Sequence, residues 1–276
     1  MPQAQVGEVT FWYEERGAGE PVLFLHGLTW DHTLWAAQIA ALESEFRCIA
    51  VDLIGHGRTP DLPRDYSLWD ESEYVAAFLE SLGVPSAHVV GLSMGGMIAM
   101  RLALRHPEKV RSLALLDTDA GPEEPSRAAT YHQLADAVVS AGWESVADQV
   151  AAILFGAPYL AVARHRQEVI AKLAANPRES VARRALRAVT ERDDLASLLG
   201  QIRVPTVVIV GELDAATPPE RAERLAAAIP GAQLVRIPEA GHHTPLERPG
   251  EVTEALREHL SRAVAFFASG EGTPYA

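Results

Sequence analysis

Short apolar runs alternate with longer amphipathic segments along most of this chain, and this alternation limits the folds it can adopt. Residues 22–25, 110–117 and 206–210 are mostly apolar runs of strand length, which indicates strands covered on both faces. The segments between the runs have the apolar spacing of a helix, as at Tyr74, Val75, Phe78, Leu79 and Leu82. Strands that alternate with helices predict an α/β protein with a doubly wound, mostly parallel sheet and right-handed crossovers.

Two stretches depart from this alternation. Residues 9–13 alternate between apolar and polar side chains, which favours a half-buried antiparallel strand at the N-terminal edge. Residues 121–200 open on Pro122 and Pro125 and contain several amphipathic helix patterns without a strand pattern. Because strands resume at residue 206, we expect one eight-stranded α/β core, residues 1–120 and 201–276, with a helical lid inserted at residues 121–200. We expect residues 269–276 to form a loose tail.

The composition argues against some classes of partner. A formal net charge of −13 over 276 residues disfavours nucleic acid and anionic membrane surfaces, since both are bound by basic faces. No apolar run approaches the ~20 residues that cross a bilayer, and the N-terminus lacks a signal-peptide pattern. We therefore expect a cytoplasmic protein that binds a small molecule and no membrane. A homo-oligomer stays possible.

A serine flanked by glycines follows one of the apolar runs. The Gly91-x-Ser93-x-Gly95 spacing between a strand and a helix fits a sharp turn that raises a serine hydroxyl above the end of a parallel sheet. Glycines on either side would let the strand and the helix approach each other closely. On this motif alone, an ordinary strand-to-helix turn with a surface serine is an equal alternative.

Three chemically competent side chains each follow the end of a predicted strand, in the order Ser93, Asp214 and His242. Ligands bind at that edge of an open parallel sheet. A serine hydroxyl needs a histidine to accept its proton and a carboxylate to hold that histidine in the right tautomer. The chain order Ser, Asp, His is the order of the α/β-hydrolase triad.

The chain resembles the α/β-hydrolase fold superfamily over nearly its full length. Four stretches carry the resemblance: His26-Gly27 after a strand, Asp52-x-x-Gly55-His56-Gly57-Arg58, Gly91-Leu92-Ser93-Met94-Gly95-Gly96, and Gly241-His242 followed by Glu247 and Pro249. The resemblance implies that Ser93 is the nucleophile, Asp214 the orienting acid and His242 the general base. It also implies an oxyanion hole formed by the backbone N–H groups of Leu28 and Met94.

Alternatives exist for two of these roles. His243 competes with His242 as the base, and Asp117 and Asp119 compete with Asp214 as the acid. We expect the substrate pocket to be lined by Trp30, Tyr131, Trp143, Phe155 and His243, with His132 and Leu154 as further candidates. His26 and His56 lie in tight glycine turns, where bonds to the backbone are expected. No group has metal-site spacing, and the sequence indicates neither a metal nor another cofactor.

The implied activity is hydrolysis of a small carboxylic ester or lactone by a serine esterase. Within the superfamily the chain looks most like the 3-oxoadipate enol-lactonase and small carboxylesterase branch. A carboxylate-bearing substrate would suit arginines of the expected lid such as Arg127, Arg164 or Arg166, and simple solvation of these side chains is the alternative. A cofactor-free haloperoxidase or perhydrolase, a carbon–carbon bond hydrolase and a ligand-sensing signalling protein are the alternatives with the same triad.

Overall fold

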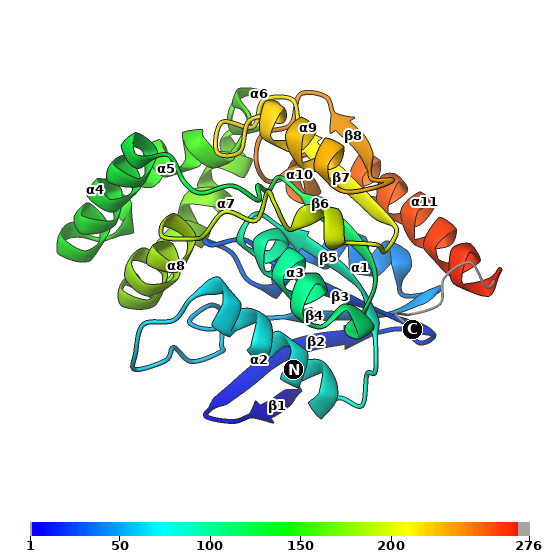
Figure 1. Cartoon of the computed structure of the whole chain (residues 1–276). Helices are drawn as coiled ribbons and strands as arrows, with labels where there is room; N and C mark the ends of the chain where they lie inside the picture. The colour runs from blue at the N-terminus through cyan, green and yellow to red at the C-terminus, as the bar shows by residue number, and fades with distance from the viewer. Residues whose placement is uncertain (1, 270–276) are drawn as a thin grey trace.

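An eight-stranded sheet forms the centre of the molecule in the computed structural model, which describes residues 2–269 (Figure 1). The strand order is β1-β2-β4-β3-β5-β6-β7-β8. β2 pairs antiparallel with β1 and β4, and the pairs from β4 to β8 are parallel. The predicted α/β class, strand number and antiparallel N-terminal edge are therefore confirmed. Most of the expected tail, residues 270–276, lies outside the described residues.

The strands match the apolar runs of the sequence, with one addition at the N-terminus. β1 precedes the alternating pattern at residues 9–13 and pairs with it, Val6 opposite Val9. The strands are β1 (Gln3–Val6), β2 (Val9–Arg16), β3 (Glu20–Leu25), β4 (Phe46–Val51), β5 (Ala87–Leu92), β6 (Val110–Leu116), β7 (Thr206–Gly211) and β8 (Gln233–Ile237).

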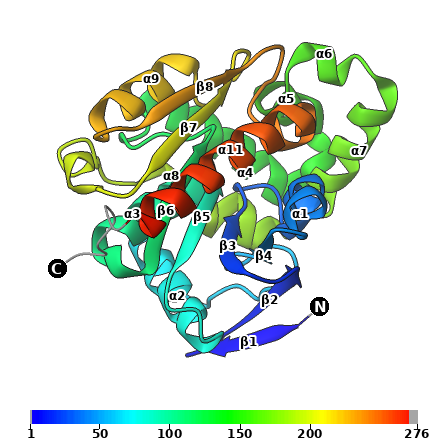
Figure 2. The ribbon, with the colours of Figure 1, turned by 90° about the vertical axis from the view of Figure 1, so that its right-hand side faces the viewer.

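Helices cover both faces of the sheet. α2 (Leu68–Ser81), α3 (Met94–Arg105) and α9 (Pro219–Ala228) lie on the face seen in Figure 1. α1 (Ala36–Leu42) and α11 (Pro249–Ala268) lie on the other face, seen in Figure 2. Successive strand residues point to opposite faces, so Leu23 packs into the first helical layer and Phe24 into the second. Such apolar runs are therefore buried throughout.

Side-chain caps begin α2 and the 3₁₀ turn that precedes α1. Asp31 accepts the N–H of Thr33 and starts a 3₁₀ turn, η1 (His32–Trp35), that leads into α1. Ser67 and Asp70 form a reciprocal capping box at the start of α2. None of the helices within residues 2–269 has the length and apolar character needed to cross a membrane.

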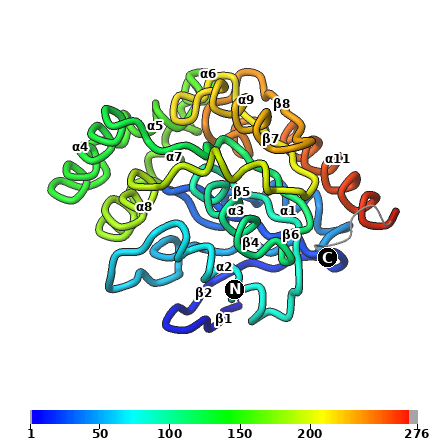
Figure 3. Tube along the Cα trace, in the orientation of Figure 1, coloured from blue at the N-terminus to red at the C-terminus, as the bar shows by residue number. Residues whose placement is uncertain are grey.

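A helical insert separates β6 from β7, and Figure 3 shows it as the green to yellow-green trace on one side of the sheet. The insert lies against the loops that follow the strands: Asn176 Nδ2 donates to Thr29 O and Ser180 Oγ donates to Gly55 O. Its segments are α4 (Pro125–Ala141), η3 (Trp143–Ser145), α5 (Ala147–Leu154), α6 (Ala157–Leu160), α7 (Ala163–Ala174), the π-helical η4 (Ser180–Ala185), α8 (Leu186–Thr190) and η5 (Leu199–Gln201). Two further short helices lie outside the insert: η2 (Pro107–Lys109) precedes β6, and α10 (Thr244–Glu247) precedes α11.

Candidate active site

Ser93 stands on a strained turn between β5 and α3. Its φ of 53° lies in the left-handed region, which residues with a side chain rarely adopt. A Cβ on Gly91 would lie 2.4 Å from Gly95 O, and one on Gly95 would lie 2.2 Å from Leu25 O. The glycines therefore allow the close approach that the motif predicted, and Ser93 projects from the end of β5.

His242 and Asp214 are hydrogen-bonded to each other. His242 Nδ1 lies 2.8 Å from Asp214 Oδ2, and both side chains are buried. The carboxylate also accepts the backbone N–H groups of Ala216 and Thr217, each at 2.8 Å. An ionised acid at this place keeps the proton of the imidazole on Nδ1, which leaves Nε2 as an acceptor. His242 and Ser93 line the same cavity.

The alternative acids and the alternative base have other contacts. Asp117 accepts from Gly211 N and Thr244 Oγ1, and Asp119 is paired with Arg221. His243 Nδ1 lies 3.4 Å from Leu154 O, and no carboxylate contacts its ring among the described residues. These contacts favour Asp214 over Asp117 and Asp119, and His242 over His243.

The two backbone amides expected to form an oxyanion hole flank Ser93. Met94 is the first residue of α3, and Leu28 follows Gly27, where a Cβ would lie 3.5 Å from Ser93 Cβ. Among the described residues, no acceptor takes the N–H of Leu28 or of Met94. Two unpaired donors beside a serine are suited to stabilise a negative oxygen.

A cavity of about 120 Å³, partly open to solvent, contains Ser93 and His242 in its wall. Its wall is mostly apolar with a few polar groups, as is usual for small-molecule sites. The predicted residues Leu28, Tyr131, Trp143, Leu154 and His243 also line it.

Two of the residues predicted to line the pocket lie outside the described cavity wall. Trp30 and Phe155 are absent from the described cavity wall and pack against the ring of His243, with centroid distances of 4.9 Å and 4.6 Å. We correct their predicted position accordingly: they contact the ring of His243 and do not line the described cavity. His132 is exposed and lies 3.2 Å from Thr190 Oγ1, outside this cavity wall.

The three arginines considered for a substrate carboxylate do not line the cavity either. Arg127 contacts Glu123, Tyr131 Oη and two backbone carbonyl oxygens. Arg164 pairs with Glu168 and Arg166 with Asp148, and all four of these side chains are more than half exposed. Each of these arginines therefore has another partner, and the ion pairs of Arg164 and Arg166 are solvated.

Two further residues organise the His242 loop. Thr217 Oγ1 lies 2.8 Å from Asp214 Oδ2 and 3.3 Å from His242 Nδ1. Glu247 accepts the backbone N–H groups of Gly241, His243 and Gly156, the last of which belongs to the insert. Glu247 belongs to the motif that begins at Gly241-His242. For Thr217, the only sign in the sequence of a functional role was its position three residues after Asp214.

The backbone bonds expected for two histidines are confirmed. His26 Nε2 accepts the N–H of Leu53 at 2.9 Å, and both ring nitrogens of His56 contact backbone carbonyl oxygens. Burial lowers the pKa of His26 to about 3, so this ring is neutral.

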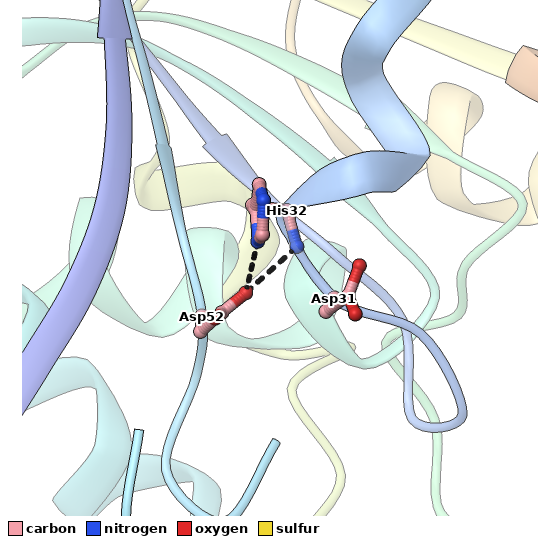
Figure 4. A group of neighbouring side chains, drawn as sticks. All are labelled: Asp31, His32 and Asp52. Carbon is pink, nitrogen blue, oxygen red and sulfur yellow. Dashed lines mark hydrogen bonds and ion pairs between the residues drawn. The ribbon is translucent and has the colours of Figure 1, made fainter. Parts of the chain in front are cut away.

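One group of side chains has the spacing of metal ligands, contrary to the sequence prediction. Donor atoms of Asp31, His32 and Asp52 lie within 4.8 Å of one another (Figure 4). His32 Nδ1 lies 2.6 Å from Asp52 Oδ1, and Asp31 is paired with Lys172. Burial alone would lower the pKa of His32, but its bond to Asp52 raises it. His32 and Asp52 bond to each other and Asp31 pairs with Lys172, so we assign no metal to this group.

A second serine–histidine–carboxylate array lies near the opposite ends of the strands. His88 Nδ1 lies 2.8 Å from Ser112 Oγ, and His88 Nε2 lies 2.9 Å from Glu20 Oε2. His88 and Ser112 are buried, and the described cavities do not include them. This array links β3, β5 and β6, and its buried serine is closed to a substrate.

Most of the chain matches a known protein family. Residues 20–249 match the model of the alpha/beta hydrolase fold family. The chain belongs to this family. The motifs on which the resemblance was recognised lie within the matched residues.

Several members of the alpha/beta hydrolase family are similar over almost the whole chain. A malate-bound thermophilic esterase from Thermogutta terrifontis is 32% identical, with a TM-score of 0.88, and the match covers 95% of this chain and 99% of the esterase. The enol-lactonase from Burkholderia xenovorans LB400 is 28% identical, with a TM-score of 0.87 and coverage of 94% and 100%. The pimeloyl-[acyl-carrier protein] methyl ester esterase of Chromobacterium violaceum is 33% identical over 90% of this chain and 96% of its own length.

Proposed function

We propose that this protein is a serine hydrolase that cleaves a small carboxylic ester or lactone through an acyl-enzyme on Ser93. The observation that carries the proposal is the bond between Asp214 and His242, beside the cavity that Ser93 also lines. The similar esterases and the enol-lactonase support the same reaction class.

In the proposed mechanism His242 Nε2 accepts the proton of Ser93 Oγ while the oxygen attacks the carbonyl carbon. Asp214 stabilises the imidazolium, and the N–H groups of Leu28 and Met94 bind the oxyanion. His242 then donates its proton to the leaving alkoxide, which departs as an alcohol. A water molecule deprotonated by His242 attacks the acyl-enzyme and releases the acid; in a lactone the alcohol stays attached to the acyl group.

In the same proposal residues 121–200 act as a lid that selects the substrate. This assignment is supported by insert residues in the cavity wall, among them Tyr131, Trp143 and Val181. The π-helical segment that carries Val181 is an uncommon conformation that often occurs at functional sites.

The test compares wild type with Ser93→Ala on p-nitrophenyl esters of graded chain length and on lactones. We expect the substitution to lower kcat by roughly 10⁶-fold, because the nucleophile is lost. Melting temperatures of the two proteins check that Ser93→Ala is folded. Undiminished ester hydrolysis by folded Ser93→Ala would refute the mechanism.

A further inference from the structure

The cavity beside Ser93 is apolar apart from a few side chains. Among the described residues in its wall, Glu123 is the one acidic side chain, and none is a lysine or an arginine. His243 also lines it, but burial lowers the pKa of this histidine to about 3, so the ring is uncharged. The apolar wall comes from the core and from the insert: Leu28, Leu92, Met97, Leu134, Ala135, Val138, Val150, Ile153, Leu154, Val181, Ala182, Leu186 and Val189.

Glu123 is held as a carboxylate by arginines that lie outside the cavity wall. Its side chain is 4% exposed and lies 3.3 Å from Arg192 Nη1 and 3.2 Å from Arg221 Nη2. Arg127 Nε lies 3.4 Å from the same carboxylate. Burial opposes ionisation, but the charges of Arg192 and Arg221 lower the pKa of Glu123. Glu123 is therefore an ionised group of the cavity wall, and the neighbouring cations pair with it.

We propose that this cavity accepts uncharged esters and lactones with an apolar acyl chain and rejects substrates that carry a second carboxylate, with Glu123 as the specificity-determining residue. The inference rests on the proposed function and specifies its substrate class. A substrate carboxylate would lose its hydration among aliphatic side chains without gaining a cation. It would also find the nearest cations, Arg127, Arg192 and Arg221, already paired with Glu123.

The test uses two esters of equal length at pH 7, p-nitrophenyl hexanoate and the mono-p-nitrophenyl ester of adipic acid. They differ only in a terminal methyl or carboxylate group. We expect kcat/KM to be at least about 100-fold higher for the hexanoate, which corresponds to about 2.7 kcal/mol. The methyl p-nitrophenyl diester of adipic acid, polar but uncharged, should fall close to the hexanoate, which separates charge from polarity.

Glu123→Gln keeps the shape of the side chain and leaves the charges of the three arginines without this partner. We expect the kcat/KM ratio of adipate monoester to hexanoate to rise about tenfold. Glu124→Gln is the matched control, because Glu124 is 3.5 Å from Arg221 Nη2 but its side chain is 65% exposed and outside the cavity wall. This control should leave the ratio unchanged.

Two results would overturn the proposal: wild type cleaving the two esters with kcat/KM within about threefold, or equal changes of the ratio in both variants. Failure of the proposed function looks different, because then none of the esters is cleaved. A binding experiment covers that case and does not depend on catalysis. Heptan-2-one should raise the Tm of Ser93→Ala, whereas 6-oxoheptanoate at the same concentration should not, and equal stabilisation by both would contradict the inference.

Discussion

The backbone conformation of Ser93 places its side chain at the cavity. A residue with a side chain adopts a φ of 53° only where its neighbours hold it there. Ser93 N donates to Leu116 O at the end of β6, and Ser93 O accepts the hydroxyl of Thr118 just after β6. These two hydrogen bonds fix the turn against β6 and the residues that follow it. The strain leaves the serine hydroxyl at the cavity, while the amide of the next residue, Met94, stays unpaired.

The neighbouring histidines should differ sharply in importance. His242→Ala removes the ring that contacts Asp214, so we expect kcat to fall by about 10⁴-fold or more. His243→Ala removes a neutral ring of the wall whose only polar contact within the described residues is Leu154 O at 3.4 Å, so we expect a loss below about 100-fold, mostly in KM. Steady-state kinetics on one ester distinguish these outcomes. Similar residual activities would contradict the choice of His242.

At the scale of elements, the insert is joined to the loop that carries His242. His242 N donates to Leu154 O, and Glu247 accepts Gly156 N and Gly241 N with one oxygen. A Cβ on Gly241 would lie 2.3 Å from Gly156 N. The end of α5 and the loop after β8 are therefore packed backbone to backbone, which couples the position of the base to that of the insert.

A buried glutamate on α2 makes stability depend on pH between 4.5 and about 8. Glu71 accepts the N–H of Ile54 with one oxygen, and its other oxygen has no partner among the described residues. Burial raises the pKa of Glu71 from 4.5 to about 8. The native state therefore binds more protons than the unfolded chain between these values, and its stability falls as the pH rises through this window.

Glu71→Gln should remove this dependence. The amide can still accept the Ile54 N–H and never ionises, so we expect a gain of about 2–4 kcal/mol in the free energy of unfolding at pH 8 and little change at pH 4.5. Urea denaturation at the two pH values measures it. The exposed residue Glu258, changed to Gln, is the control. A gain of equal size at both pH values would count against the ionisation of Glu71.

At the scale of the whole molecule, the buried layers on the two faces of the sheet contain several histidines. Burial lowers the pKa of His26, His243 and His259 to about 3 each. An unfolded chain protonates these rings below about pH 6.5, whereas the native state excludes the proton until about pH 3. Their contribution to stability is therefore complete above pH 6.5 and is lost as the pH falls.

We expect the free energy of unfolding to decrease between pH 6.5 and pH 4 by up to about 1.4 kcal/mol per pH unit for each of these histidines. Urea titrations at several pH values measure the slope. His259→Gln should reduce it by one such contribution, whereas His132→Gln, at an exposed position, should not. An unchanged slope in His259→Gln would show that this ring titrates in the native state.

Features that depend on the local pattern of residues were predicted from the sequence, whereas features that depend on contacts between distant segments were not. Ser93, Asp214 and His242 were predicted together because parallel strands bring their carboxyl ends to one edge, whatever the packing of the helices. The contacts of Arg127 with Glu123 and with residues 215 and 216 were not predicted, because they form only in the fold. The group of Asp31, His32 and Asp52 was not predicted, because Asp52 lies 20 residues from His32 in the chain.

The α/β class, the order of the reactive residues and the place of the turn at Ser93 follow from the sequence alone, because strand and helix periods and glycine spacing are local properties. The cavity wall does not follow from it. Periodicity indicates which face of a helix is buried, but the partner of that face depends on how helices of the insert pack on distant loops. Hence Tyr131 reaches the described cavity wall and Phe155 does not, and only the assembled fold brings Glu123, with its arginines already paired, to that cavity.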